Sequence, residues 1–273
     1  MKYTSRQGAR QFTLLLALCV SLSSLTIFAQ QHADNEYLEG AILWTQLSGE
    51  KAALSYQAFA LARLRLDQDL RTNRHNKMRR AVIVDVDETV LDNSRYQAML
   101  VKTRQNYESK TWTEWCNRAE ATALPGAVEF LHYANSRGVR VFYITNRKET
   151  EKEGTARNLK QVGFPDVNDE TLLVRTDRSS SSKEPRRLSV AAKYRVVLLI
   201  GDNLNDFAEV FEKSRTIDSR MDAAQSNQTQ FGARFIVLPN PMYGSWEDAI
   251  YGDASNLTEE QKAEKRRKAL KDY

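Results

Sequence analysis

The sequence predicts an α/β protein with a mostly parallel sheet that is flanked by helices. Two short apolar runs, residues 81–84 and 196–200, have the length and the β-branched content of strands that are buried on both faces. Segments with a helical spacing of apolar residues alternate with such runs, and this alternation favours βαβ units. At 273 residues, 41% of them hydrophobic and 27% charged, the chain is able to bury a core of its own.

The first 33 residues have the layout of a secretory signal peptide. Lys2, Arg6 and Arg10 precede an apolar stretch, residues 12–28, and small or polar residues follow it. We therefore predict a periplasmic or otherwise exported protein whose main domain spans residues 34–273. An uncleaved N-terminal anchor is the alternative, because the apolar stretch is close to the shortest that spans a bilayer.

The chain has two cysteines, Cys19 and Cys116, and the first lies in the predicted signal peptide. The remaining thiol has no partner for an internal disulfide. A membrane association through lipidation of Cys19, as in an outer-membrane lipoprotein, is an alternative that the bulky Leu18 disfavours. Outside the signal, basic and acidic residues nearly balance, which argues against nucleic acid as a partner.

Helices and strands are expected to alternate after the signal. Residues 36–70 have a near-helical apolar period, and Gly49 is expected to divide them into two helices. The further expected elements are, in order, a helix over 127–134, strands over 139–144 and 172–174, a polar loop over 179–182, a strand over 235–238 followed by a loop over 239–244, and a charged tail, 258–273, containing a helix whose basic run 265–268 faces solvent.

Four acidic residues follow the first two apolar runs. Asp85 and Asp87 come after residues 81–84, and Asp202 and Asp206 come after residues 196–200. The carboxyl ends of neighbouring parallel strands meet at one crevice, so these side chains are expected to lie together. Such a cluster repels itself unless it binds a cation, and oxygen ligands favour Mg²⁺.

The block DVDET, residues 85–89, suits covalent phosphoryl transfer. Its first carboxylate can attack phosphorus, and the second, two residues on, can act as general acid and base. An EF-hand loop is excluded because Val90 stands where that loop needs glycine. An acidic turn without function is the alternative for this block taken alone.

Three further blocks extend the pattern. The third predicted strand ends in Thr145 and Asn146, whose hydroxyl and amide can bind phosphate oxygens. Lys183 follows in the serine-rich loop, and GDNLND closes the set at residues 201–206. Arg186 and Lys193 are the alternatives to Lys183. In this order the blocks resemble the haloacid dehalogenase (HAD) superfamily of aspartate-nucleophile phosphotransferases.

A closer resemblance is to the class C bacterial acid phosphatases, exported enzymes that include outer-membrane 5′-nucleotidase lipoproteins. It rests on DVDETVLDN, WTEW, LPGAVEFL, VFYITNRKE, GDNLNDF and FIVLPNPMYGSWE, and it spans residues 36–252. The resemblance implies a HAD-like Rossmannoid core with a smaller helical subdomain, and an Mg²⁺-dependent acid phosphatase that acts on small phosphomonoesters. It also suggests a homodimer.

The resemblance implies a role for each block. Asp85 forms an aspartyl-phosphate, and Asp87 protonates the leaving oxygen and then activates water. Thr145, helped by Asn146, holds a phosphate oxygen, and Lys183 neutralises negative charge. Because the acid must start protonated, an acidic pH optimum is expected.

For the metal, the resemblance implies that the carboxylates of Asp85 and Asp202 and the backbone carbonyl of Asp87 bind Mg²⁺. Asp206 either supports the metal shell or orients Lys183. Only two of the four carboxylates would then touch the ion.

Aromatic residues near these blocks bear on the substrate. The resemblance places Trp112 and Tyr243 in a clamp that stacks on a flat group, which implies nucleoside 5′-monophosphates or aryl phosphates. Core packing is the alternative for both, and it is the favoured interpretation for Trp115 and Trp246. Two other functions stay open, a phosphotransferase that uses the same intermediate and a phosphate-binding or storage protein without catalysis.

Overall fold

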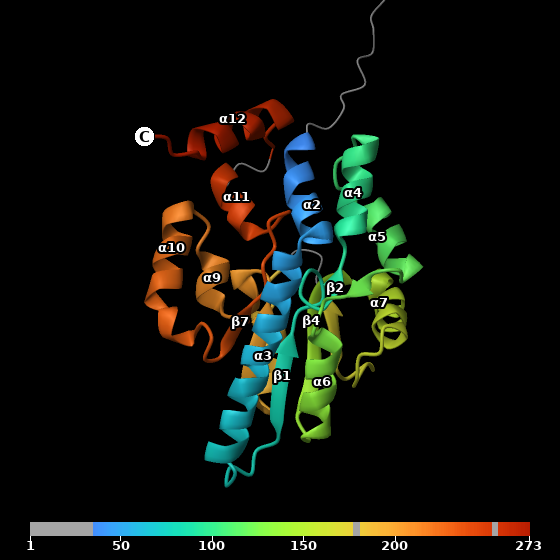
Figure 1. Cartoon of the computed structure of the whole chain (residues 1–273), viewed down its shortest axis with the longest axis vertical. Coiled ribbons are helices and arrows are strands. Elements are labelled where there is room, and N and C mark those ends of the chain that lie inside the picture. The colour runs from blue at the N-terminus through green and yellow to red at the C-terminus, as the bar shows by residue number, and fades with distance from the viewer. Residues whose placement is uncertain (1–34, 177–180, 253–255) are drawn as a thin grey trace, which may run out of the picture. The chain divides into compact units, whose positions relative to one another are not determined.

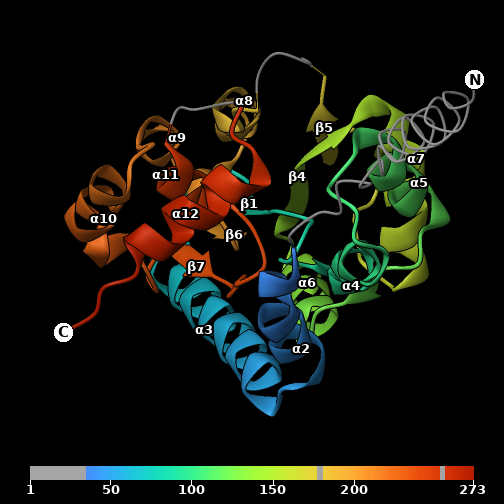
Figure 2. The same cartoon turned by 90° about the horizontal axis from the view of Figure 1, so that it is seen from above.

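Five parallel strands form the central sheet of the computed structural model (Figure 1), in the order β5-β4-β1-β6-β7 that Figure 2 labels. The strands are β1 (Arg80–Val84), β4 (Arg140–Lys148), β5 (Leu172–Arg175), β6 (Arg195–Gly201) and β7 (Phe235–Val237). Each contains or overlaps a predicted apolar run, so the predicted mostly parallel α/β fold is confirmed. At the carboxyl end of β1, Val84 pairs with Tyr143 on one side and with Ile200 on the other.

The structure describes residues 35–176, 181–252 and 256–273, which belong to one compact unit. The predicted signal peptide with Cys19 and part of the polar loop predicted over residues 179–182 lie outside these ranges. Within them, we find no helix with both the length and the hydropathy of a membrane span.

Helices cover both faces of the sheet (Figure 2). Alternate residues of β1 point to opposite faces. Val82 and Val84 join one apolar cluster, and Ala81 and Ile83 join the other. The first cluster includes residues of α3 (Gly49–Thr72), α6 (Ala127–Ser136) and α7 (Glu149–Gln161), and the second those of α8 (Glu184–Ala191), α9 (Glu209–Lys213) and α10 (Ile217–Ser226).

The smaller helical part lies beyond the carboxyl edge of the sheet (Figure 1). It contains α2 (Glu39–Leu47), α4 (Ser94–Thr103), α5 (Ser109–Arg118), α11 (Ser245–Tyr251) and α12 (Glu259–Ala269), with the short η1 (Glu36–Leu38). The predicted break in residues 36–70 is present, because Ser48 is extended and its side chain caps α3 by accepting from the Lys51 amide at 3.1 Å. A two-stranded ribbon, β2 (Leu91–Asp92) with β3 (Thr122–Ala123), was not predicted.

Two boundaries differ from the sequence prediction. The apolar run of the third predicted strand ends at residue 144, whereas β4 runs to Lys148 and includes Thr145 and Asn146 at its end. The charged tail is helical over Glu259–Ala269, and its basic run does not face solvent throughout. Arg266 is half-buried, with its guanidinium 3.6 Å from the centre of the Tyr37 ring, because a planar cation stacks well on an aromatic face.

Candidate active site

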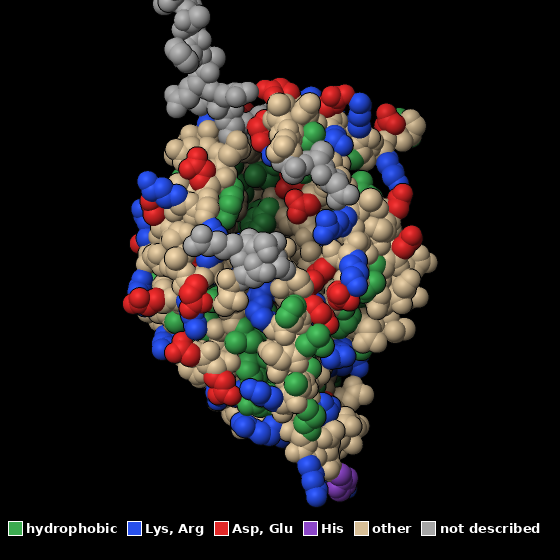
Figure 3. Space-filling model, turned by 180° about the vertical axis from the view of Figure 1, so that it is seen from behind, with side chains coloured by type: hydrophobic (Ala, Val, Ile, Leu, Met, Phe, Trp, Pro, Cys, Tyr) green, Lys and Arg blue, Asp and Glu red, His purple; other side chains and the backbone are tan. Residues whose placement is uncertain are grey.

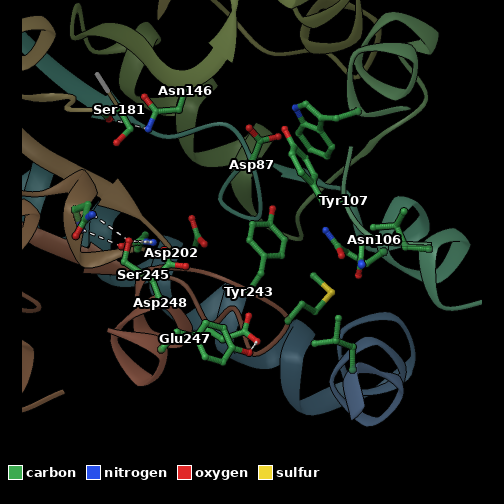
Figure 4. Close-up of a pocket in the computed structure, with 18 of the residues that line it drawn as sticks. Asp87, Asn106, Tyr107, Asn146, Ser181, Asp202, Tyr243, Ser245, Glu247 and Asp248 are labelled. Atoms are coloured by element: carbon green, nitrogen blue, oxygen red, sulfur yellow. Dashed lines mark hydrogen bonds between the residues drawn. The ribbon is translucent and has the colours of Figure 1, made fainter. Parts of the chain in front are cut away.

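The carboxyl ends of β1 and β6 bring the two acidic blocks together. Asp85 follows β1, Asp202 follows β6, and Asp206 ends the one-turn helix η2 (Leu204–Asp206). These three residues each place a carboxylate oxygen within 4.8 Å of the other two. With Asp87 they line a cavity of about 1030 Å³ (Figure 4). The surface view shows a hollow with acidic and hydrophobic side chains around it (Figure 3).

Lys183 lies between two of these carboxylates. Its Nζ donates to Asp85 Oδ1 and, at 2.6 Å, to Asp206 Oδ1, and the side chain is buried. Burial acts to lower the pKa of this lysine, but the carboxylates of Asp206 and Asp85 outweigh it and raise the pKa. Burial raises the pKa of Asp85, and Lys183 opposes that rise. The ion pair therefore favours the ionised carboxylate that a nucleophile needs.

The two alternative cations have other surroundings. Arg186 donates to the Thr145 carbonyl at 2.5 Å and to Asn146 Oδ1 at 2.7 Å, so it braces the end of β4. Lys193 is exposed beyond α8. Of the three cations considered from the sequence, Lys183 is the one bound to Asp85.

Both carboxylate oxygens of Asp206 accept hydrogen bonds. Oδ1 accepts from Lys183, and Oδ2 accepts from the Asn203 amide at 3.0 Å. The close approach requires glycine at position 201, where an added Cβ would collide with the Asp206 side chain. These contacts fit an Asp206 that orients Lys183, and its carboxylate also belongs to the group of three that could hold a metal ion.

Asp202 has the surroundings of a metal ligand. Its Oδ1 accepts from Thr89 Oγ1 at 3.1 Å, and its Oδ2 accepts from Asn240 Nδ2 at 2.9 Å. Burial, followed by repulsion from Asp206, raises the pKa of Asp202 to about 7. A divalent cation would offset this repulsion, and a set of carboxylate oxygens suits Mg²⁺. The residues therefore fit a metal ion held by Asp85 and Asp202.

Asp87 makes a separate set of contacts. Its Oδ1 accepts from Arg147 Nη2 at 2.8 Å and from Asn93 Nδ2 at 2.9 Å. Its Oδ2 accepts from Thr145 Oγ1 at 3.3 Å. Thus Lys183 donates to Asp85, whereas Arg147, Asn93 and Thr145 donate to Asp87.

The structure separates Thr145 from Asn146. Successive side chains of a strand point to opposite faces, and β4 extends past both residues. Thr145 is completely buried beside Asp87, whereas Asn146 is exposed, lines the cavity and donates to the Ser181 carbonyl at 2.8 Å. The two side chains therefore approach the site from different directions.

Sequence reasoning missed Arg147, Asn93 and Glu88. Arg147 directly follows the Thr-Asn pair at the end of an apolar strand. A charged residue in that position is the one feature of the sequence that could have indicated a role in the site. Glu88 has a φ of 54°, a conformation that strains a residue with a side chain. It is buried, accepts from the Asn93 amide at 3.0 Å and accepts from the Tyr243 hydroxyl. These contacts hold the loop that carries Asp87.

The aromatic residues differ in exposure. Tyr243 lines the cavity, and so does Trp112, which is 9% exposed and packs edge-on to Tyr96 with 5.1 Å between ring centres. Tyr107, which the sequence did not single out, is 58% exposed and lies in the cavity near Asp87 (Figure 4).

For the remaining two tryptophans, core packing was the favoured interpretation. It suits Trp115, which is buried and donates Nε1 to Asn93 Oδ1 at 2.8 Å. It is wrong for Trp246, which is 42% exposed because it lies in the first turn of the surface helix α11.

A family model described as HAD superfamily, subfamily IIIB (acid phosphatase), matches residues 16–246. Two solved structures of the class C acid phosphatase from Bacillus anthracis, one of them a crystal structure with tungstate bound, are each 40% identical to this chain. They cover 88% of this chain and 98% of their own, with TM-scores of 0.83 and 0.82.

Curated plant proteins are more distantly similar. The Stem 31 kDa glycoprotein of Glycine max is 26% identical over 214 residues, which are 76% of this chain and 71% of that protein. Acid phosphatase 1 of Solanum lycopersicum is 27% identical over 165 residues, which are 59% of this chain and 57% of that protein.

Proposed function

The chain belongs to the acid phosphatases of HAD subfamily IIIB, which are phosphoric monoester hydrolases, and we propose that it works through a phosphoenzyme formed on Asp85. The observation that carries this proposal is the buried pair of Asp85 and Lys183 at the carboxyl end of a central strand. A carboxylate there can attack phosphorus, and a buried ammonium can offset the negative charge that develops.

In the first half-reaction, an oxygen of Asp85 bonds to phosphorus while the bond from phosphorus to the leaving oxygen breaks. Asp87 gives its proton to that oxygen, so the alcohol leaves neutral and Asp87 becomes a carboxylate. Lys183 offsets charge on the phosphoryl oxygens. The Thr145 hydroxyl, 3.3 Å from Asp87 Oδ2, can turn toward one of them.

In the second half-reaction, a water oxygen bonds to phosphorus while the bond from phosphorus to Asp85 breaks. Asp87 takes the proton of that water, which restores the starting enzyme and releases inorganic phosphate. One acid–base residue thus serves both halves. An acidic optimum follows because Asp87 enters the cycle protonated.

Mg²⁺ is the cofactor in this proposal. The carboxylates of Asp85 and Asp202 and the backbone carbonyl of Asp87 would hold it. When bound, such an ion neutralises clustered carboxylates and polarises a phosphoryl oxygen. Burial, followed by repulsion from Asp206, raises the pKa of Asp202 to about 7, and this supports the assignment because a bound cation would stabilise the ionised carboxylate.

We expect EDTA to abolish hydrolysis of p-nitrophenyl phosphate and added Mg²⁺ to restore it. Asp202→Asn removes one charge from the ligand set, so the Mg²⁺ concentration for half-maximal activity should rise about tenfold or more. Asp248→Asn, a change in the same cavity but on α11, is the matched control. Full activity after exhaustive chelation would remove the metal from the proposal, and no activity under any condition would refute hydrolysis itself.

The proposal extends to nucleoside 5′-monophosphates and aryl phosphates as substrates. Trp112 and Tyr243 line the same cavity as Asp85, and Tyr107 adds a third ring. Aromatic rings near a phosphate site offer flat faces on which a base can stack.

Tyr243→Ala is expected to lower kcat/KM for a nucleoside 5′-monophosphate about tenfold, since a stacked base contributes about 1–3 kcal/mol. The kcat/KM for glycerol phosphate should change far less, and Trp112→Ala should alter the preference in the same direction. Tyr243→Phe keeps the ring but loses the hydroxyl that donates to Glu88, so it should keep the nucleotide preference. Equal losses on both substrates, or a wild type that prefers sugar phosphates, would count against the clamp.

Export is also part of the proposal. It is supported by the basic, apolar and small-residue order of residues 1–33. Mass spectrometry of the protein recovered from its native host tests it, because an intact N-terminus on a protein retained in the cytoplasm would contradict it.

A further inference from the structure

Arg147 is the largest of the side chains that the described residues bury completely, yet it lines the catalytic cavity. A buried guanidinium is costly unless its N–H groups and its charge are matched. Here the charge is matched by Asp87, which accepts from Nε at 3.0 Å and from Nη2 at 2.8 Å. A buried arginine therefore lies against the proposed acid–base residue.

The guanidinium is itself held from three sides. Its Nη1 donates to Thr155 Oγ1 at 3.1 Å, and its Nη2 donates to Asn93 Oδ1 at 3.1 Å. Thr155 donates onward to the Glu151 carbonyl at 2.7 Å within α7, and Trp115 donates to the same Asn93 oxygen at 2.8 Å. The planar guanidinium of Arg147 is therefore fixed by residues of α5, α7 and the loop before α4.

The consequence for Asp87 is an asymmetry between its two oxygens. Oδ1 accepts three N–H groups, two from Arg147 and one from Asn93. Oδ2 has one partner among the described residues, the Thr145 hydroxyl, at the longer distance of 3.3 Å. A carboxyl oxygen that already accepts three hydrogen bonds is poorly suited to carry a proton.

We propose that Arg147 is a positioning residue that anchors Asp87 through Oδ1, so that Oδ2 exchanges the proton with the leaving oxygen and later with water. This inference rests on the proposed function, because it concerns the acid–base residue of that reaction. In this role Arg147 acts through Asp87 and needs no contact of its own with phosphorus or the leaving group. The rigid fork keeps Oδ2 in place through both half-reactions, and small errors in the position of a catalytic group are costly. The competing account is structural, in which Arg147 only ties β4 to its neighbouring helices.

The leaving group separates the two accounts. Arg147→Lys keeps the charge but loses the planar fork. The measurement is kcat/KM for phenyl, alkyl and p-nitrophenyl phosphates, with the inhibition constant of inorganic phosphate as the readout of binding. We expect kcat/KM to fall on the order of 100-fold for the phenyl and alkyl esters, whose leaving oxygens need the proton, and much less for p-nitrophenyl phosphate. The inhibition constant should stay near the wild-type value. An equal loss on every ester, or no loss, would overturn the proposal.

A second variant guards against a failure to fold. Trp115→Phe keeps a buried ring but removes the donor to Asn93, so it loosens the brace without touching Arg147 or Asp87. Its kcat/KM should fall several-fold for the phenyl and alkyl esters and less for p-nitrophenyl phosphate, with little change in the thermal unfolding temperature. A folded Trp115→Phe protein with an unchanged or uniformly lowered profile would overturn the proposal even if Arg147→Lys does not fold.

Asp87→Asn in the same assay distinguishes a failure of the positioning role of Arg147 from a failure of the acid–base role of Asp87. If Asp87→Asn shows the dependence on the leaving group and both Arg147→Lys and Trp115→Phe lack it, the positioning role is wrong and the proposed function stands. If Asp87→Asn lacks it as well, the acid–base assignment fails, and the positioning role fails with it.

Discussion

Asp85→Asn is expected to reduce phosphatase activity by a factor on the order of 10⁴ or more without unfolding the protein. The amide has no charge and is a poor nucleophile, so no phosphoenzyme should form. The fold should persist because the amide has the shape of the carboxylate and its oxygen can still accept from Lys183 Nζ. Lys183 also keeps a second partner, Asp206, at 2.6 Å. Hydrolysis of p-nitrophenyl phosphate and thermal unfolding measure the two expectations.

Trapping by acid quench with radiolabelled substrate tests the intermediate directly. Wild-type protein should retain label that hydroxylamine releases, as an acyl phosphate does, and Asp85→Asn should retain none. Asp92→Asn is the matched control, since Asp92 belongs to the same segment and its side chain accepts from the Ser94 amide at 2.8 Å instead of from Lys183. Labelling of a folded Asp85→Asn protein would assign the attack to another group.

The sheet and the acidic crevice could be predicted because their signals are local. Each of the two strands that carry the acidic blocks is an unbroken apolar run, and the aspartates follow at positions where parallel strands must end together. The order of the blocks then singled out Lys183, although its burial between two carboxylates is a property of the folded chain.

The surroundings of Asp87 could not be predicted in this way. Asn93, Trp115 and Thr155 come from three segments that have no common period or motif. Asn93 and Thr155 bind Arg147 directly, and Trp115 reaches it through Asn93. The end of β4 illustrates a second limit. The strand continues through polar residues because Thr145 and Arg147 find buried partners, and an apolar run alone gives no sign of this extension.

The contacts also divide the four carboxylates. Asp206 has both oxygens engaged by Lys183 and the Asn203 amide, and Asp87 is engaged by Arg147. Asp202, by contrast, accepts from two neutral side chains, Thr89 and Asn240, so its charge is the best candidate for balance by a cation, and the proposal places Asp85 beside it as the second ligand. The asymmetry follows from which residue supplies the neighbouring donor, since the four side chains are chemically identical.

Asp87→Asn is expected to lower turnover by about 10²- to 10⁴-fold and to change the step that limits it. The amide oxygen of the new side chain can still accept from Arg147 and Asn93, so the loop should keep its geometry. The amide cannot deliver a proton or take one. A nucleotide, with a basic leaving oxygen, should therefore suffer far more in the first half-reaction than p-nitrophenyl phosphate, whose leaving group departs without help.

Hydrolysis of the phosphoenzyme needs Asp87 whatever the leaving group was, because the attacking water must lose a proton in every case. With p-nitrophenyl phosphate, Asp87→Asn should thus release one p-nitrophenol per active site in a burst and then turn over slowly, and hydroxylamine-sensitive label should accumulate. Asp206→Asn is the comparison: it removes the negative charge from one of the two partners of Lys183, so it should slow formation of the phosphoenzyme and give no burst. If Asp87→Asn shows no burst and keeps the wild-type ratio of nucleotide to p-nitrophenyl phosphate hydrolysis, Asp87 is not the acid–base residue. A burst without a change in that ratio would leave Asp87 as base alone, because the two half-reactions place separate demands on one carboxylate.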